Sequence, residues 1–174
     1  MPSATRPAPR DVTMFENLTT PEDLLAFRLG SLLSGEHDSL DMLEELQKVV
    51  STEELRSVFS EHADETRRQI QNVERRLEIA GKPGDESPSP TTAGLAKEAH
   101  SLLRKVGESL QDAVALSAGL ETEHLEIGTY TGLITLAESC GQQEVSDLLA
   151  TNLREEVEAA DKVAVALRKA QGLA

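Results

Sequence analysis

Hydrophobic positions recur along most of this chain at alternating intervals of three and four residues, the spacing of an α-helix that buries one face. The first such stretch begins at Thr20 and Pro21, since threonine caps helices well and proline fits the first helical turn. It runs to about Val50. Ser51, with a glutamate three residues later, predicts a capping box that opens a second helix, and Gly81 ends that helix. The two helices are expected to form an antiparallel hairpin.

The second half of the chain repeats this plan after a long connection. Residues 82–90 are rich in glycine, proline and serine and predict a loop, and residues 91–106 predict a short amphipathic helix. Two further long helices are expected at about 109–140 and 142–171, with a glycine between them. The expected fold is therefore all-α: two antiparallel helix hairpins joined by a long crossover that contains a short helix. That order is typical of a ferritin-like four-helix bundle.

The two hairpins also resemble each other in sequence. With a shift of 90 residues, apolar positions of the first hairpin coincide with apolar positions of the second. The matching pairs are Leu43 and Leu133, Leu46 and Leu136, Leu55 and Val145, Phe59 and Leu149, Val73 and Val163, and Leu77 and Leu167. We interpret the chain as a duplicated hairpin. Residues 1–15, rich in proline, are expected to form a flexible tail, and residues 16–174 a single bundle domain.

Composition narrows the classes of protein that this fold could serve. Only 2% of the 174 residues are aromatic and 39% are hydrophobic, which favours aliphatic helix packing over a β-rich core. The formal net charge of −14 would repel a phosphate backbone, so nucleic acid is not an expected partner. No apolar run reaches the roughly 20 residues of a membrane span. Cys140 is the single cysteine, and the beginning of the chain lacks a signal-like apolar stretch, so we expect a cytoplasmic protein.

Polar residues interrupt the predicted core stripes at similar heights in all four helices. Glu36 stands where the first stripe would continue with an apolar residue, and His62 and Glu65 lie one turn apart on the second. The shift of 90 residues aligns Glu36 with Glu126 and Glu65 with Glu155. Each of these acids lies about 14 residues from the turn of its hairpin, or about 21 Å at 1.5 Å per residue. Four carboxylates are therefore predicted to meet in the middle of the bundle.

The negative charge of such a set of acids has to be compensated by positive charge or protons, because burying an unpaired carboxylate costs several kcal/mol. Two divalent ions would neutralise four carboxylates, and hard oxygen ligands with few imidazoles suit iron or manganese. The predicted metal ligands are Glu36, His62, Glu65, Glu123, Glu126 and Glu155. Glu156 is left open, as a ligand or a solvent-facing acid, and His62 as a ligand or a residue that orients one.

Several of these segments give the chain a specific resemblance to the YciE/YciF-type ferritin-like stress proteins. The segments are Glu16-Asn17-Leu18, residues 59–66, Glu123-His124-Leu125-Glu126-Ile127 with Tyr130, and Leu153-Arg154-Glu155-Glu156. The resemblance extends over nearly all of residues 16–167 and implies a ferritin-like fold, frequent dimers, a binuclear metal site and a role in stress. The chain departs from the family pattern at residues 33–36, which keep only the acid of a Tyr-Asp-Ala-Glu stretch, and at Leu125, where a tyrosine is common.

Two hypotheses follow. In the first, the protein is a di-metal carboxylate protein of stress response that oxidises ferrous iron or consumes peroxide. Glu36 and Glu126 would then be terminal or chelating ligands, Glu65 and Glu155 bridging ligands, and His62 would bind a metal ion or orient a ligand. In the second, it is a metal-free helical interaction protein, without catalysis, whose buried acids are protonated or bridged by water. The partners expected are metal ions and a second copy of the chain.

Overall fold

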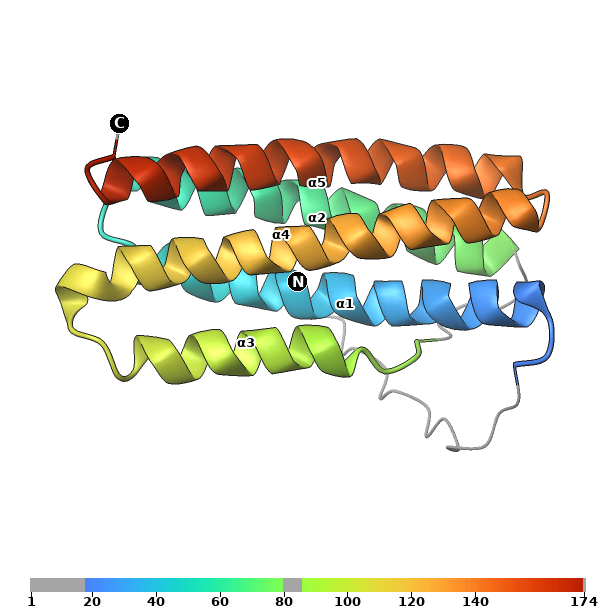
Figure 1. The fold of residues 1–174 in the computed structure, drawn as a ribbon, viewed down its shortest axis with the longest axis horizontal. Helices are drawn as coiled ribbons and strands as arrows, with labels where there is room; N and C mark the ends of the chain where they lie inside the picture. Colours follow the sequence, from blue (N-terminus) through green and yellow to red (C-terminus); the bar gives the residue numbers. More distant parts are fainter. Residues whose placement is uncertain (1–17, 80–85, 174) are drawn as a thin grey trace, which may run out of the picture.

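The computed structural model describes residues 18–79 and 86–173, and throughout these ranges the regular structure is helical (Figure 1). The predicted tail at 1–15 lies outside the described residues. Four long helices and one shorter helix follow one another along the chain: α1 Pro21–Val49, α2 Glu53–Ile79, α3 Pro90–Leu103, α4 Glu108–Ser139 and α5 Gln143–Ala170. No helix within the described ranges has the length and apolar content that a membrane crossing requires.

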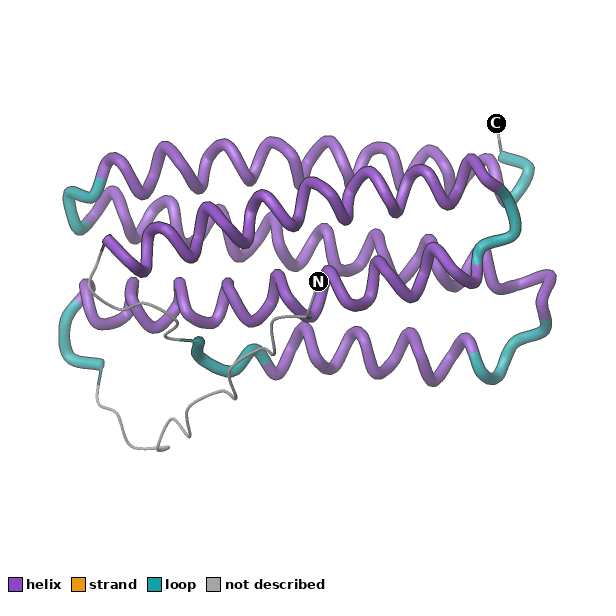
Figure 2. The backbone as a smooth tube through the Cα atoms, turned by 180° about the vertical axis from the view of Figure 1, so that it is seen from behind, coloured by secondary structure: helices purple, strands orange, loops and turns teal. Residues whose placement is uncertain are grey.

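The long helices form a four-helix bundle made of two hairpins. Helices α1 and α2 form one hairpin and α4 and α5 the other, with α1 packed on α4 and α2 on α5. The two hairpin turns lie at opposite ends of the bundle, as the views from the two sides show (Figures 1 and 2). Helix α3 belongs to the crossover and lies against α1 and α4. The predicted arrangement of hairpin, crossover and hairpin is confirmed.

Helix ends follow local rules, with one exception to the prediction. The side chain of Thr20 accepts a hydrogen bond from the Asp23 backbone, and the Asp23 side chain accepts one from Thr20, so this cap is confirmed. The capping box predicted at Ser51 is wrong. Ser51 instead donates its backbone and hydroxyl hydrogen bonds to Asp112 at the start of α4, and Thr52 accepts from the backbone of α2.

Two apolar clusters fill the bundle, one toward each end. The first is built from the beginning of α1, the end of α2, the end of α4 and the beginning of α5, and includes Leu29, Val73 and Leu133. The second is built from the opposite halves of the same helices together with Ala99 of α3, and includes Leu43 and Phe59. Most buried polar side chains of the four long helices come from the segments between these clusters, so a polar layer lies between two apolar cores.

Two glycines of α4 should respond in opposite directions to the same substitution. A Cβ at Gly119 would lie 3.1 Å from Cε1 of the fully buried Phe59, whereas a Cβ at Gly132 would meet nothing within 4 Å. We expect Gly119→Ala to lower the free energy of unfolding by about 1–3 kcal/mol through overpacking. Gly132→Ala should raise it by about 0.5–1 kcal/mol, because alanine favours the helix. Chemical denaturation of the two variants checks this, and a stabilised Gly119→Ala would contradict the packing described.

Candidate metal centre

Acidic side chains from three helices and one histidine from the fourth are buried together in the polar layer. Each has an exposed fraction of 3% or less. They are Glu36 on α1, His62 on α2, Glu123 and Glu126 on α4, and Glu156 on α5. Carboxylates at this depth are rare unless they are paired or bind a cation.

The buried stripes of α2 and α5 explain which acids point inward. On α5 the stripe has regular spacings of four and three: Val145, Leu149, Asn152, Glu156, Ala159 and Val163. On α2 the corresponding buried residues are Leu55, Phe59, His62, Thr66, Gln69 and Val73. The prediction placed Glu65 on this stripe, whereas the buried residue of that turn is its neighbour Thr66. Consequently Glu65 and Glu155 lie at the edge of the bundle, and the inward acid of α5 is Glu156.

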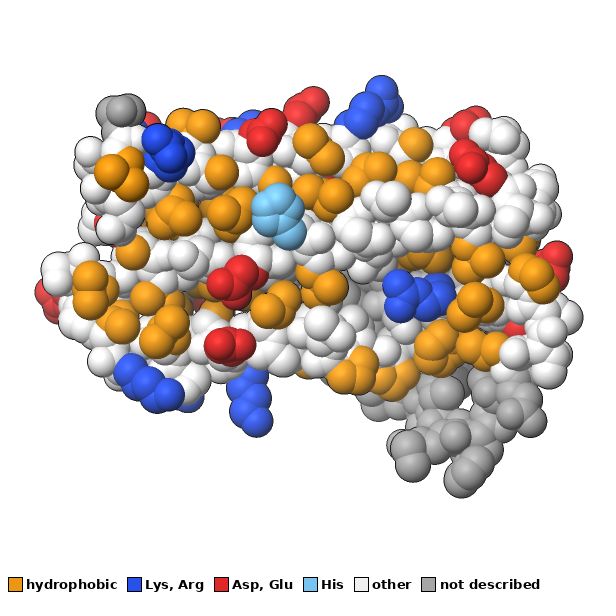
Figure 3. Space-filling model, in the orientation of Figure 1, with side chains coloured by type: hydrophobic (Ala, Val, Ile, Leu, Met, Phe, Trp, Pro, Cys, Tyr) orange, Lys and Arg blue, Asp and Glu red, His pale blue; other side chains and the backbone are white. Residues whose placement is uncertain are grey.

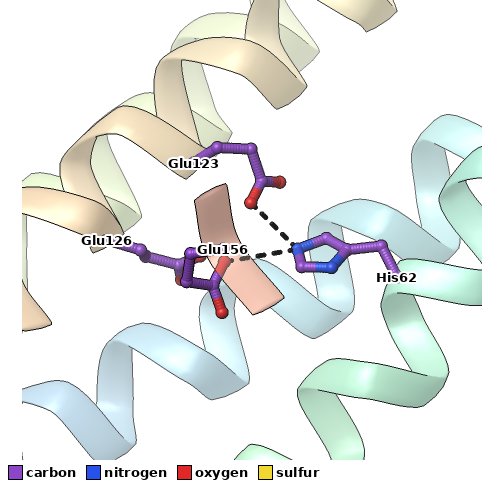
Figure 4. Close-up of side chains that lie close together, drawn as sticks. All are labelled: His62, Glu123, Glu126 and Glu156. Atoms are coloured by element: carbon purple, nitrogen blue, oxygen red, sulfur yellow. Dashed lines mark ion pairs between the residues drawn. The ribbon is translucent and has the colours of Figure 1, made fainter. Parts of the chain in front are cut away.

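The tightest group consists of His62, Glu123, Glu126 and Glu156, whose side chains point toward one another (Figure 4). One ligand atom of each lies within 4.8 Å of the ligand atoms of the others. Nε2 of His62 is 3.0 Å from Oε2 of Glu123 and 3.6 Å from Oε2 of Glu156. Nε2 of His62 makes no hydrogen bond in either contact. Four donor atoms thus surround one small space, the arrangement that metal coordination requires.

Glu36 lies beside this group and is held by a tyrosine. The hydroxyl of Tyr130 donates to Oε1 of Glu36 at 2.5 Å and accepts from Nδ2 of Asn152 at 3.1 Å. Asn152 in turn accepts from Asn72 on α2. The other oxygen of Glu36, Oε2, is buried without a hydrogen-bond partner. Tyr130 therefore fixes one oxygen of Glu36 and leaves the second oxygen available to a metal ion.

Glu65 and Glu155 occupy the edge of the centre, between α2 and α5. The Glu65 side chain is 21% exposed and the Glu155 side chain 30%. Oε2 of Glu65 lies 3.1 Å from Nδ1 of His62, so it can hold the imidazole with Nε2 turned toward the buried acids. This is how an outer carboxylate orients a metal-binding histidine. Glu155 accepts a hydrogen bond from Gln69.

The centre holds four buried acids and one histidine, and burial shifts the pKa values of most of them. Burial raises the pKa of Glu36 to about 7, and burial together with the neighbouring acids raises the pKa of Glu126 and Glu156 well above the usual range. Burial alone would lower the pKa of His62, but the carboxylates of Glu123 and Glu65 outweigh it and raise that pKa to about 11. One imidazolium thus faces several carboxyl groups.

The carboxylate oxygens offer a direct test of whether a cation would fit. Six buried oxygens have no hydrogen-bond partner: Oε2 of Glu36, both oxygens of Glu123, Oε1 of Glu126 and both oxygens of Glu156. Buried polar atoms without partners are costly, and a bound cation would supply what they lack. Oxygen donors with one imidazole are the ligands that iron and manganese bind in carboxylate bundles. The residues present therefore fit the metal ions predicted.

Glu36 should make the stability of the metal-free protein depend on pH. Because its pKa is raised in the folded state, to about 7, the unfolded chain loses this proton at lower pH than the folded chain. The free energy of unfolding should consequently fall between about pH 4.5 and pH 7, by up to about 3 kcal/mol for this group. Denaturation in the presence of a chelator measures it. Glu36→Gln should remove this part of the pH dependence, and an unchanged profile in that variant would refute the assignment.

Fold and site together define the class: an all-helical ferritin-like bundle with a buried layer of carboxylates and one histidine. A family model described as a domain of unknown function, DUF892, matches residues 20–171, and the chain belongs to that family. Among curated proteins, Protein YciF of Escherichia coli strain K12 is 30% identical over 142 residues, covering 80% of this chain and 86% of the relative. The family resemblance predicted from the sequence is confirmed.

Solved structures agree with this membership. The crystal structure of the E. coli stress protein YciF matches with a TM-score of 0.81 and 28% identity, over 88% of this chain and 98% of that one. The YcfI protein of Rhodopseudomonas palustris matches with a TM-score of 0.82 and 27% identity, over 86% of this chain and 96% of that one. The predicted ferritin-like fold is therefore confirmed along most of the chain.

Proposed function

We propose that this protein binds two divalent metal ions, iron or manganese, within the polar layer of the bundle. His62, Glu123, Glu126 and Glu156 would hold metal in the tightest group, and Glu36 would contribute its free oxygen beside it. The observation that carries the proposal is the set of fully buried carboxylate oxygens without partners. Two divalent ions would balance the four buried carboxylates. Glu65 and Glu155, also predicted as ligands, are proposed to orient His62 and to close the edge of the centre.

The chemistry proposed is oxidation of ferrous iron or consumption of peroxide during stress. The E. coli relative is called a stress protein, which supports this role. Iron or manganese, when bound, supplies redox chemistry with dioxygen or peroxide. The chain itself excludes bulk water through the two apolar clusters, and Tyr130 holds Glu36. Glu65 keeps the imidazole of His62 in one orientation, with Nε2 facing the centre.

Metal analysis of the purified protein tests the proposal. We expect about two iron or manganese ions per chain, lost on chelation and regained on reloading. Protein that stays metal-free after incubation with ferrous or manganous ions, with unchanged stability, would refute it. Aerobic addition of ferrous iron should also give faster oxidation than a buffer control. Binding without faster oxidation would leave the metal site and remove the proposed oxidation of ferrous iron.

A second function is favoured by one specific observation. The raised pKa values of Glu36, Glu126 and Glu156, whose largest cause is burial, allow these acids to remain protonated without metal. His62 could then balance the remaining charge through Glu123. In this alternative the protein is a helical interaction protein with a polar core layer and no catalysis. The same metal analysis separates the two functions, because the alternative requires no uptake of metal.

We further propose that the protein forms a homodimer. Apolar side chains are numerous on the face formed by α3, α4 and α5 (Figure 3). The exposed apolar side chains of the described residues include Val157 and Val165 on α5 and Leu110 on α4. Exposed apolar side chains are often covered by a partner. Light scattering during gel filtration would show twice the mass of the chain, and a monomer at high concentration would exclude the dimer.

A further inference from the structure

A small cavity of about 120 Å³ lies where α1, α4 and the first turn of α3 meet. Ser31 and Gly35 line it from α1, Thr92 from α3, and Glu126 and Thr129 from α4. Its volume suits about four water molecules. Half of the ten residues that line it carry hydroxyl groups. The lining also includes Leu32, Leu125 and one acid of the proposed metal centre, Glu126.

Glu126 connects this cavity with the interior of the bundle. Its side chain is only 3% exposed, belongs to the tightest group of potential ligands, and has one oxygen, Oε1, that is buried without a hydrogen-bond partner. The same residue lines the cavity. A small polar species in the cavity would therefore meet a ligand of the centre in a lining that combines hydroxyl groups with the apolar side chains of Leu32 and Leu125.

The walls of the cavity are fixed by close packing and hydrogen bonds. A Cβ at Gly35 would lie 3.3 Å from Cγ2 of Thr92, so the absence of a side chain at Gly35 lets α3 approach α1. The hydroxyl of Thr92 donates to Asp38 at 2.9 Å, and that of Ser31 to the Pro88 carbonyl at 3.2 Å. The crossover thus lies against the bundle as the outer wall of this cavity.

The opposite edge of the centre is covered by charged pairs. Lys162 lies 3.7 Å from Glu65, and Arg68 lies 3.8 Å from Glu155. A cation approaching from that side would have to pass two basic side chains. Among the residues that line the cavity, Arg28 is the one basic side chain, and it lies exposed on α1.

We propose that this cavity is the port through which a divalent metal ion reaches the centre. Hydroxyl oxygens of Ser31 and Thr129 replace part of the hydration shell of the ion, and Glu126 is the first carboxylate it meets. Arg28 slows the approach by repulsion. This inference rests on the proposed metal binding, and it adds a route and a set of residues that control the rate of loading.

The test measures how fast metal-free protein takes up cobalt(II), followed in a stopped-flow instrument by the visible absorption of the bound ion. Thr129→Leu fills the cavity from α4. Thr131→Leu is the matched control, because Thr131 is exposed on the same helix and makes the same hydrogen bond to the carbonyl four residues back. Thr129→Leu should slow uptake on the order of tenfold, with the same cobalt bound at equilibrium. Thr131→Leu should load like the unmodified protein.

Arg28→Gln gives a second measurement with the opposite sign. Because Arg28 is exposed, its replacement should leave the fold unchanged and speed cobalt uptake about twofold or more at low salt. Uptake by Thr129→Leu and Arg28→Gln at the rate of the unmodified protein would overturn the port while leaving the metal centre intact. If the unmodified protein takes up no cobalt, the proposed function fails, and the port with it.

Discussion

Replacing Glu156 with glutamine should weaken binding of divalent metal by about a hundredfold or more and, at the same time, stabilise the metal-free protein. The carboxylate is fully buried in the tightest group of potential ligands, and both of its oxygens are without hydrogen-bond partners. Its pKa is raised well above the usual range by burial and by Glu36 and Glu123. A neutral amide of the same shape removes that cost, so we expect the free energy of unfolding to rise at pH 8, where the unfolded chain has lost this proton. Calorimetric metal titration and denaturation with a chelator measure the two effects.

The neighbouring acid supplies the matched control. Glu155 has the same side chain one position earlier on α5 but is 30% exposed and hydrogen-bonded to Gln69. Glu155→Gln should change metal affinity much less, by about tenfold at most. An equal loss of affinity in the two variants, or a metal-free Glu156→Gln protein that is less stable than the unmodified one, would contradict the ligand assignment.

Replacing His62 with alanine should destabilise the metal-free protein by about 3 kcal/mol near pH 6.5, because it removes the cation that faces several buried acids. Nε2 of His62 lies 3.0 Å from Glu123, and burial, outweighed by Glu123 and Glu65, leaves its pKa raised to about 11. A raised histidine pKa contributes stability that is complete below about pH 6.5 and is lost as the pH rises toward 11. The cost of His62→Ala should therefore shrink by about 1 kcal/mol per pH unit between pH 7 and pH 9.

A purely apolar truncation distinguishes the charge effect from the cavity effect. Leu116 is fully buried in the second apolar cluster, so Leu116→Ala should cost about 2–5 kcal/mol by creating a cavity. That cost has no titrating partner and should be the same at pH 6.5 and pH 9. If the cost of His62→Ala is also independent of pH, the imidazole acts as packing and not as a counter-charge.

The fold was predictable because its determinants are local. Thr20 and Pro21 mark the start of α1, Gly141 with its positive φ of 68° marks the turn between α4 and α5, and the spacing of apolar residues marks the helices between them. The start of α2 was not predicted correctly. Asp112 is 61 residues away from Ser51 in sequence, and the two hydrogen bonds between them are a tertiary contact that no local sequence pattern can predict.

The polar layer was predicted at the right height but partly in the wrong phase. Glu36 and Glu126 lie inside as expected, whereas Glu65 and Glu155 lie at the edge because the buried stripe passes through positions 66 and 156. The information was in the sequence: Leu149 to Glu156 and on to Val163 are seven-residue steps on one face. The hydrogen bond from Tyr130 to Glu36 could not be predicted from the sequence. The two residues are 94 positions apart and meet only because α1 packs on α4.

Anomalous diffraction at the iron and manganese edges, from crystals of metal-loaded protein, tests the central claim most directly. We expect two anomalous peaks inside the bundle, enclosed by Glu36, His62, Glu123, Glu126 and Glu156. Peaks confined to the exterior, with these five side chains joined only by hydrogen bonds to one another or to water, would contradict it.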